Sequence, residues 1–93
     1  MTLQDRFKGS DDVVFRDIAG EMVLLNLSSG LYYGLDPVGS RIWETFSEGP
    51  CAVSKVCDVV EAQFDASRDV IERDVLALVE DLLENELIHR VPS

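Results

Sequence analysis

The sequence is short of the residues that build metal sites and disulfides. It contains one histidine, His89, and two cysteines that do not form a Cys-x-x-Cys pair. Cys51 and Cys57 fall in a stretch with helical periodicity, where their spacing places them about 240° apart around the helix axis. Structural zinc sites draw on closely spaced Cys and His ligands. We therefore expect no metal site and no pairing between the two cysteines.

Basic residues are also scarce, with 8 Lys and Arg against 18 Asp and Glu and a formal net charge of -10 at pH 7. A field of this sign repels nucleic-acid phosphates and anionic lipids, so neither is an expected partner. It would steer a basic peptide or a basic protein patch toward the surface, although acidity also serves plain solubility. Charge alone leaves these two interpretations open.

Long apolar runs are absent. No run approaches the roughly 18 residues that suggest a membrane-spanning helix. The opening residues, MTLQDRFKGSDD, lack the apolar core of a signal peptide. We therefore expect a cytoplasmic protein with no membrane partner.

Catalytic groups are missing in the combinations that enzymes need. No glycine-rich loop precedes an expected helix, and His89 stands beside Arg90, where a solvated position is typical. Glu72, Glu80 and Glu84 recur at helical spacing away from the apolar positions, as on a solvated face. We expect no catalytic residue and no cofactor. A small enzyme ranks last among the alternatives, and turnover by the isolated chain would reveal it.

What the sequence does contain is enough apolar material for one domain. Its 93 residues are 46% hydrophobic, and a chain of this length is above the size at which a core usually needs disulfides or metals. Hydrophobic periodicity changes near Asp36 from strand-like to helical. We expect a flexible N-terminus over residues 1–10 and a single domain over residues 11–90.

The first third of that domain predicts a three-stranded antiparallel meander. Val13–Ile18 is rich in β-branched and aromatic residues, Ala19-Gly20 interrupts it, and Glu21–Leu27 resumes the pattern. Ser28-Ser29-Gly30 has turn chemistry, and Leu31–Leu35 follows as a short third strand.

Three helices are predicted next, which makes the fold class α+β. The first begins at Asp36-Pro37, a capping carboxylate followed by proline, and ends at Gly49-Pro50. The second spans about residues 52–64. The third spans about residues 67–84, with Ser67 as N-cap and Asn85 as a left-handed terminator. Its core row is expected to be Ile71, Val75, Leu78 and Leu82, flanked by Leu76, Val79 and Leu83.

The strand Leu31–Leu35 should lie at an edge of the meander, with backbone groups open to an added strand. Tyr32 and Tyr33 would point to opposite faces, and Gly34 would permit close backbone approach. Proline at Tyr33 or Gly34 should then abolish capture of a peptide, with Tyr33 the cleaner test. The alternative is that Gly34 marks a bulge and the tyrosines only pack.

The third helix offers a second wall for such a groove. Val70, Asp74, Ala77 and Asp81 form a stripe beside its core row that mixes small apolar residues with acids. The stripe could take an extended peptide with apolar anchors and a basic neighbour. The alternative, which the spacing alone favours, is a boundary stripe that binds nothing.

Two long segments give the sequence a family resemblance. Residues 22–43, MVLLNLSSGLYYGLDPVGSRIW, and residues 73–83, RDVLALVEDLL, resemble the PqqD-like family, also known as RiPP recognition elements. The resemblance implies a winged-helix-like fold that binds the leader of a ribosomal precursor peptide as a strand between the third strand and the third helix. The peptide-binding residues by this reading are Leu31, Tyr32, Tyr33, Gly34, Leu35, Val70, Arg73, Asp74 and Ala77, with Asp81 added from the helix stripe.

Within that family, residues 26–30 are more similar to the free-standing proteins of lasso-peptide pathways than to the quinone-cofactor members. The similarity implies two partners, a lasso precursor and a separate leader peptidase or modifying enzyme. One departure is Asn85-Glu86, where the family usually has glycine. Two alternative functions are a winged-helix DNA-binding regulator, which the acidic charge disfavours, and a peptide chaperone in pyrroloquinoline quinone biosynthesis.

Overall fold

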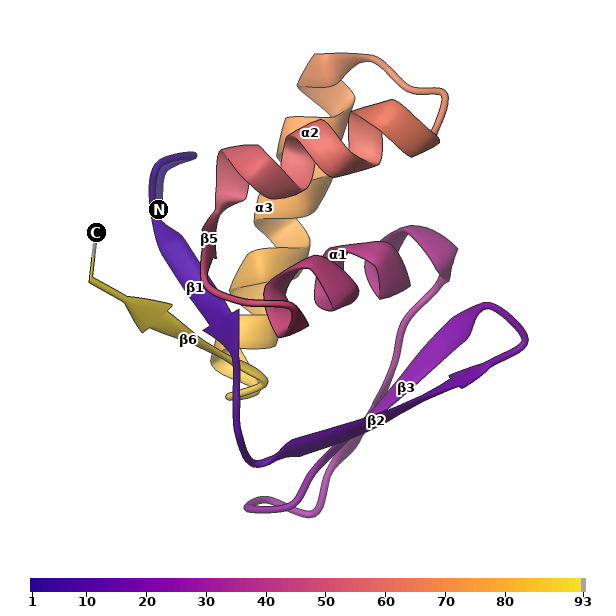
Figure 1. Ribbon diagram of the computed structural model, residues 1–93, viewed down its shortest axis with the longest axis vertical. Coiled ribbons are helices and arrows are strands. Elements are labelled where there is room, and N and C mark those ends of the chain that lie inside the picture. Colours follow the sequence, from indigo (N-terminus) through magenta and orange to yellow (C-terminus); the bar gives the residue numbers. More distant parts are fainter. Residues whose placement is uncertain (93) are drawn as a thin grey trace.

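The computed structural model describes residues 1–92 and has the α+β architecture that the periodicity predicts (Figure 1). The elements in chain order are β1 (Arg6–Gly9), β2 (Val13–Ile18), β3 (Glu21–Asn26), β4 (Tyr32–Gly34), α1 (Pro37–Ser47), β5 (Cys51–Ala52), α2 (Val53–Gln63), α3 (Arg68–Glu84) and β6 (Ile88–Val91).

The predicted meander is confirmed as an antiparallel sheet of order β2-β3-β4, here called the meander sheet. Its first hairpin turns at Ala19 and Gly20, whose φ angles of 56° and 88° suit the two-residue turns that match strand twist. Asp17 Oδ1 accepts a hydrogen bond from Gly20 N at 2.8 Å and fixes the turn. The meander sheet projects away from α2 and lies against α1 (Figure 1).

A second antiparallel sheet, of order β5-β1-β6, is present in the described residues and was not predicted. Part of the segment expected to be flexible, residues 1–10, forms β1, in which Phe7 is fully buried. The Phe7 ring meets Phe46 edge-on at 6.2 Å, and the Arg90 guanidinium lies 5.1 Å from the Phe7 ring centroid. One apolar residue in a four-residue strand leaves too little periodicity to detect.

The helices agree with prediction except at the two ends of α3. Asp36 caps α1 as expected, with its Oδ1 accepting from Gly39 N at 2.7 Å. Ser67 holds the N-cap position of α3, but its side chain makes no capping hydrogen bond. The left-handed residue after α3 is Glu86, with φ of 58°, and not Asn85, with φ of -88°. Asn85 Nδ2 instead donates back to Asp81 O at 2.8 Å, so the chain reverses one residue later.

One core joins the helices to both sheets. Its largest fully buried side chains include Trp43, Phe7, Phe46, Leu24 and Ile42. The predicted core row of α3 is confirmed at Ile71, Val75 and Leu82, but Val79 is buried in place of Leu78. Leu78 is only half-buried, which places it on the boundary that faces the meander sheet.

Candidate functional site

The open edge of β4 is the feature around which the candidate site is built. β4 pairs with β3 on one side and with no strand of residues 1–92 on the other. Leu35 N donates to Met22 O at 2.9 Å, and Leu31 O accepts from Asn26 N at 3.0 Å, so these two groups point toward β3. Antiparallel pairing alternates along a strand, and Leu24 is the partner of Tyr33. Tyr33 therefore turns its N–H and C=O toward β3, while Tyr32 and Gly34 turn theirs to the free side.

This alternation corrects the expectation about proline. Proline at Tyr33 would remove a hydrogen bond to β3 and not a donor at the open edge, so it is the wrong test of strand addition. Gly34 is the better position. It pairs in continuous register with Val23, so it marks no bulge, and its φ is not positive. A Cβ atom added there would meet nothing within 4 Å.

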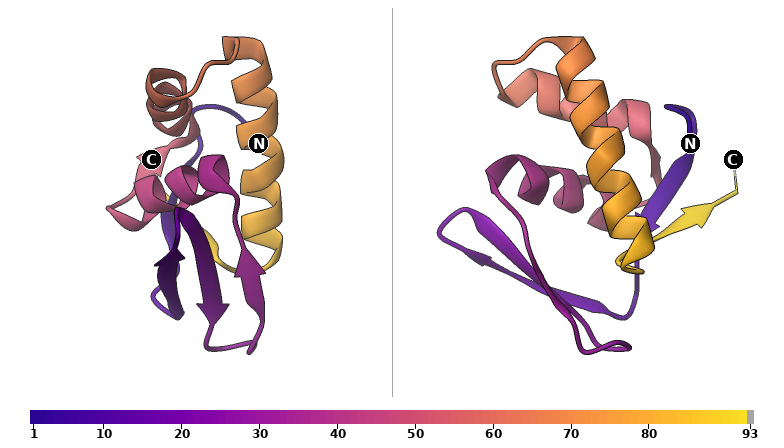
Figure 2. Two further views of the ribbon diagram at one scale, coloured as in Figure 1. Left: turned by 90° about the vertical axis from the view of Figure 1, so that its right-hand side faces the viewer. Right: turned by 180° about the vertical axis from the view of Figure 1, so that it is seen from behind.

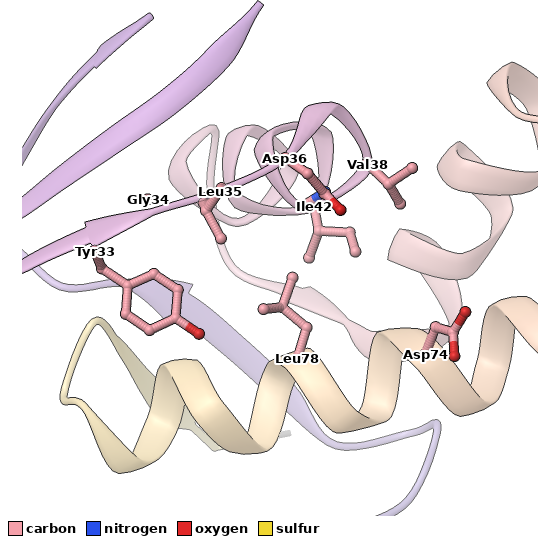
Figure 3. A pocket seen from close by; sticks show the side chains of 9 residues that line it. Tyr33, Gly34, Leu35, Asp36, Val38, Ile42, Asp74 and Leu78 are labelled. Atoms are coloured by element: carbon pink, nitrogen blue, oxygen red, sulfur yellow. The ribbon is translucent and has the colours of Figure 1, made fainter.

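Beside this edge lies a cavity of about 310 Å³ between β4, the start of α1 and α3 (Figure 3). We call it the β4 groove, and its lining residues are Tyr33, Gly34, Leu35, Asp36, Val38, Gly39, Ile42, Asp74 and Leu78. Figure 3 shows Leu78 rising from α3 toward Ile42 and Leu35, so the floor is apolar. The left view of Figure 2 shows β4 on the side of the meander sheet nearest α3.

Tyr33 links the two walls of the β4 groove. Its ring lies between β4 and α3 (Figure 3), and its hydroxyl donates to Asp81 Oδ2 at 3.3 Å. Burial raises the pKa of the Tyr33 phenol, and the charge of Asp81 and this hydrogen bond raise it further. The phenol is thereby kept in the protonated form that can donate.

The structure brings together only part of the predicted helix stripe. Asp74 lines the β4 groove and Asp81 contacts Tyr33, whereas Val70, Arg73 and Ala77 are exposed on α3 and do not line it. Sequence reasoning gave no site role to Val38 or Ile42, and it assigned Leu78 to the core row of α3. Periodicity finds the apolar face of a helix but not the part of that face that an open strand edge leaves uncovered.

Tyr32 lies on the opposite face of the meander sheet. It is 74% exposed and borders a second concavity of about 450 Å³, which is lined by Val14, Phe15, Arg16, Ile18, Val23, Leu25 and Tyr32. Leu31, just before β4, is also exposed. The two tyrosines therefore point to opposite faces, as alternation along a strand predicts.

The described residues present little reactive chemistry elsewhere. Cys51 and Cys57 are free thiols, and burial raises the pKa of each. His89 is exposed on β6. Within residues 1–92, no group of three or more His, Cys, Asp or Glu side chains is placed to hold a metal ion, and no helix is long and apolar enough to cross a membrane.

Residues 21–88 match the family model described as coenzyme PQQ synthesis protein D (PqqD), a span that runs from β3 to the start of β6. The chain belongs to the PqqD family. Both walls of the β4 groove fall inside the matched span, while β1 and β2 lie outside it.

Two solved structures resemble this PqqD-family chain over nearly all their length. One is described as TbiB1 in complex with the TbiA(beta) leader peptide, with 38% identity, a TM-score of 0.83, and coverage of 92% of this chain and 99% of that one. The other is a lasso peptide synthetase B1 complexed with the leader peptide, with 27% identity, a TM-score of 0.76, and coverage of 92% and 98%. A comparison with curated protein sequences found no match.

Proposed function

We propose that this chain binds the leader segment of a ribosomally made precursor peptide as an additional strand on β4. The observation that carries the proposal is the outward N–H and C=O groups of Tyr32 and Gly34 beside an apolar groove closed by α3. The two similar proteins, both in complexes with leader peptides, support it. Strand addition to an exposed sheet edge is an established mode of peptide capture.

Only every second side chain of such a guest would contact the β4 groove. Successive side chains of an added strand alternate between faces, so one set would enter the groove beside Tyr33 and the other would emerge beside Tyr32. Leu35, Ile42 and Leu78 offer the inward set apolar contacts. Asp74 and Asp81 favour a basic residue next to an apolar anchor. Leu31 and the exposed α3 residues Val70, Arg73 and Ala77 would contact a guest only beyond the groove.

The proposed role is non-catalytic capture followed by delivery. The guest would be the leader of a lasso precursor, and a separate leader peptidase or modifying enzyme would act on it in the cytoplasm. Support comes from the two similar structures, whose descriptions concern lasso-peptide synthesis or a leader peptide. A chaperone role in pyrroloquinoline quinone biosynthesis is the alternative that the family model suggests.

Charge counts against DNA binding by a winged-helix regulator. In α3, Arg68 is already held by Asp58 at 2.8 Å, Glu61 at 3.5 Å and Glu72 at 2.8 Å. Arg73 lies 3.5 Å from Asp74. A helix that reads DNA needs free cations toward the phosphates, and these are neutralised by neighbouring acids.

The matched variants Gly34→Pro and Gly34→Ala test strand addition. Proline removes an outward N–H and places a ring on the open edge, so binding should weaken at least about tenfold. Alanine keeps the N–H, and its Cβ meets no atom of the free chain within 4 Å, so binding should weaken much less than in the proline variant. The measurement is fluorescence anisotropy with two labelled probes, the TbiA(beta) leader and the leader encoded by the nearest short precursor gene.

Two outcomes would contradict the proposal. One is wild-type protein that binds neither probe. The other is folded Gly34→Pro protein that binds as tightly as Gly34→Ala. Circular dichroism of both variants serves as the folding control.

A further inference from the structure

Asn26 is a buried polar residue that joins the end of β3 to the residues that follow α3. It ends β3 and is only 2% exposed. Its backbone N–H donates to Leu31 O at 3.0 Å, and its backbone C=O accepts from Gly30 N at 2.8 Å. These bonds close the turn that leads the chain into β4.

The side-chain oxygen of Asn26 shapes the same turn. Oδ1 accepts hydrogen bonds from Ser28 N at 2.9 Å and from Ser29 N at 3.2 Å. This is the local bonding by which Asn side chains stabilise turns. The oxygen thus fixes the approach to the strand wall of the groove.

The side-chain nitrogen of Asn26 reaches the two residues that follow α3. Nδ2 donates to Asn85 O and Glu86 O, each at 3.3 Å, where the chain leaves α3. These carbonyls lie at a helix end, where backbone acceptors lack partners within the helix. Within residues 1–92, the other side-chain hydrogen bond between the meander sheet and α3 is the exposed one from Tyr33 to Asp81.

We infer that Asn26 is a positioning residue that sets the distance between β4 and α3 and thereby the width of the β4 groove. The inference rests on the proposed function and adds to it the residue on which its geometry depends. The role needs an acceptor and a donor on one short side chain. An amide supplies both, whereas an ionised carboxylate supplies acceptors only.

The variant Asn26→Asp keeps the hydrogen-bond acceptor of this side chain and removes its donor. The introduced carboxylate can still accept from Ser28 N and Ser29 N, but it repels the Asn85 and Glu86 carbonyls. The folded variant should bind the leader probe about tenfold more weakly than wild type near neutral pH. As the pH falls and the carboxyl takes up a proton, it can donate again, and the ratio of variant to wild-type affinity should rise toward one.

The readout is binding by folded protein at each pH, with wild type titrated in parallel and the folded fraction measured by denaturant unfolding. A purely structural role would lower the unfolding free energy and leave the affinity of folded protein unchanged, which would overturn the inference. A folded variant whose relative affinity does not recover on acidification would also overturn it. Wild type that fails to bind any probe would instead sink the proposed function.

If Asn26→Asp does not fold, a measurement on the wild-type protein still tests the inference. The side-chain amide protons of Asn26, followed by nitrogen-edited NMR, should exchange with water more slowly than those of an exposed asparagine. Exchange at the rate of a free asparagine side chain would mean that the bonds to Asn85 and Glu86 do not form, and the inference would fail.

Discussion

At the residue scale, neighbouring positions in β4 have distinct physical roles. Tyr33 bonds to β3 through its backbone and to Asp81 through its hydroxyl. Tyr32 and Gly34 leave their backbone groups on the open side. Backbone groups alternate in direction along a strand, and the pairing register with β3 determines which residues face β3 and which face the open side. One residue of slip would exchange these roles.

The pKa of the Tyr33 hydroxyl reports on the contact between β4 and α3. This pKa lies above the usual 10.0 because of burial first and the Asp81 charge second. The folded chain therefore favours the neutral phenol. This stabilisation is fully present below the pKa that Tyr33 has in the unfolded chain, and it is lost as the pH rises through the higher pKa of Tyr33 in the folded chain. Asp81→Asn should lower the Tyr33 pKa part of the way back, since burial remains.

Ultraviolet titration of phenolate, with Tyr33→Phe subtracted to isolate this residue, measures the shift. A Tyr33 pKa that is the same in wild type and Asp81→Asn would show that the two side chains do not interact.

Sequence reasoning predicted the placement of those candidate-site residues whose positions depend on local rules. Asp36 as a helix cap, the opposed tyrosines and the acids Asp74 and Asp81 follow from spacing and capping chemistry. Leu78 could not be recovered, because an apolar residue at helical spacing looks the same whether a strand covers it or leaves it open.

At the element scale, the N-terminal strand β1 is held in place by pairing with β5 and β6. β1 pairs with β5 and β6, which come from positions more than 40 residues later in the chain. The meander and the helices were predictable because their partners are close in sequence and their periodicity is strong. β1, β5 and β6 were not, because each is short and its partners are remote.

Phe7→Ala tests the packing of β1. Removing a fully buried ring that contacts Phe46 should lower the free energy of unfolding by about 3–5 kcal/mol. Gln4→Ala, which alters an exposed side chain in the same segment, is the control and should change it by less than about 0.5 kcal/mol. Denaturant unfolding gives both values, and equal effects would mean that the segment is not packed as described.

At the scale of the whole molecule, the β4 groove lies where the meander sheet meets the helices. The C-terminal part of α3 runs beside β4, and α1 begins at the apolar floor of the groove (Figures 2 and 3). The chain as a whole carries a net charge of -10, which suits a peptide guest with basic residues and disfavours a polyanion. Fold and charge therefore favour the same class of partner.

Amide hydrogen exchange with and without bound leader tests the central claim most directly. If the leader adds as a strand to β4, the amides of Tyr32 and Gly34 should exchange fast in the free chain and become protected on binding, while Tyr33 is protected in both states. Saturating leader that leaves Tyr32 and Gly34 exchanging as in the free chain would contradict the account.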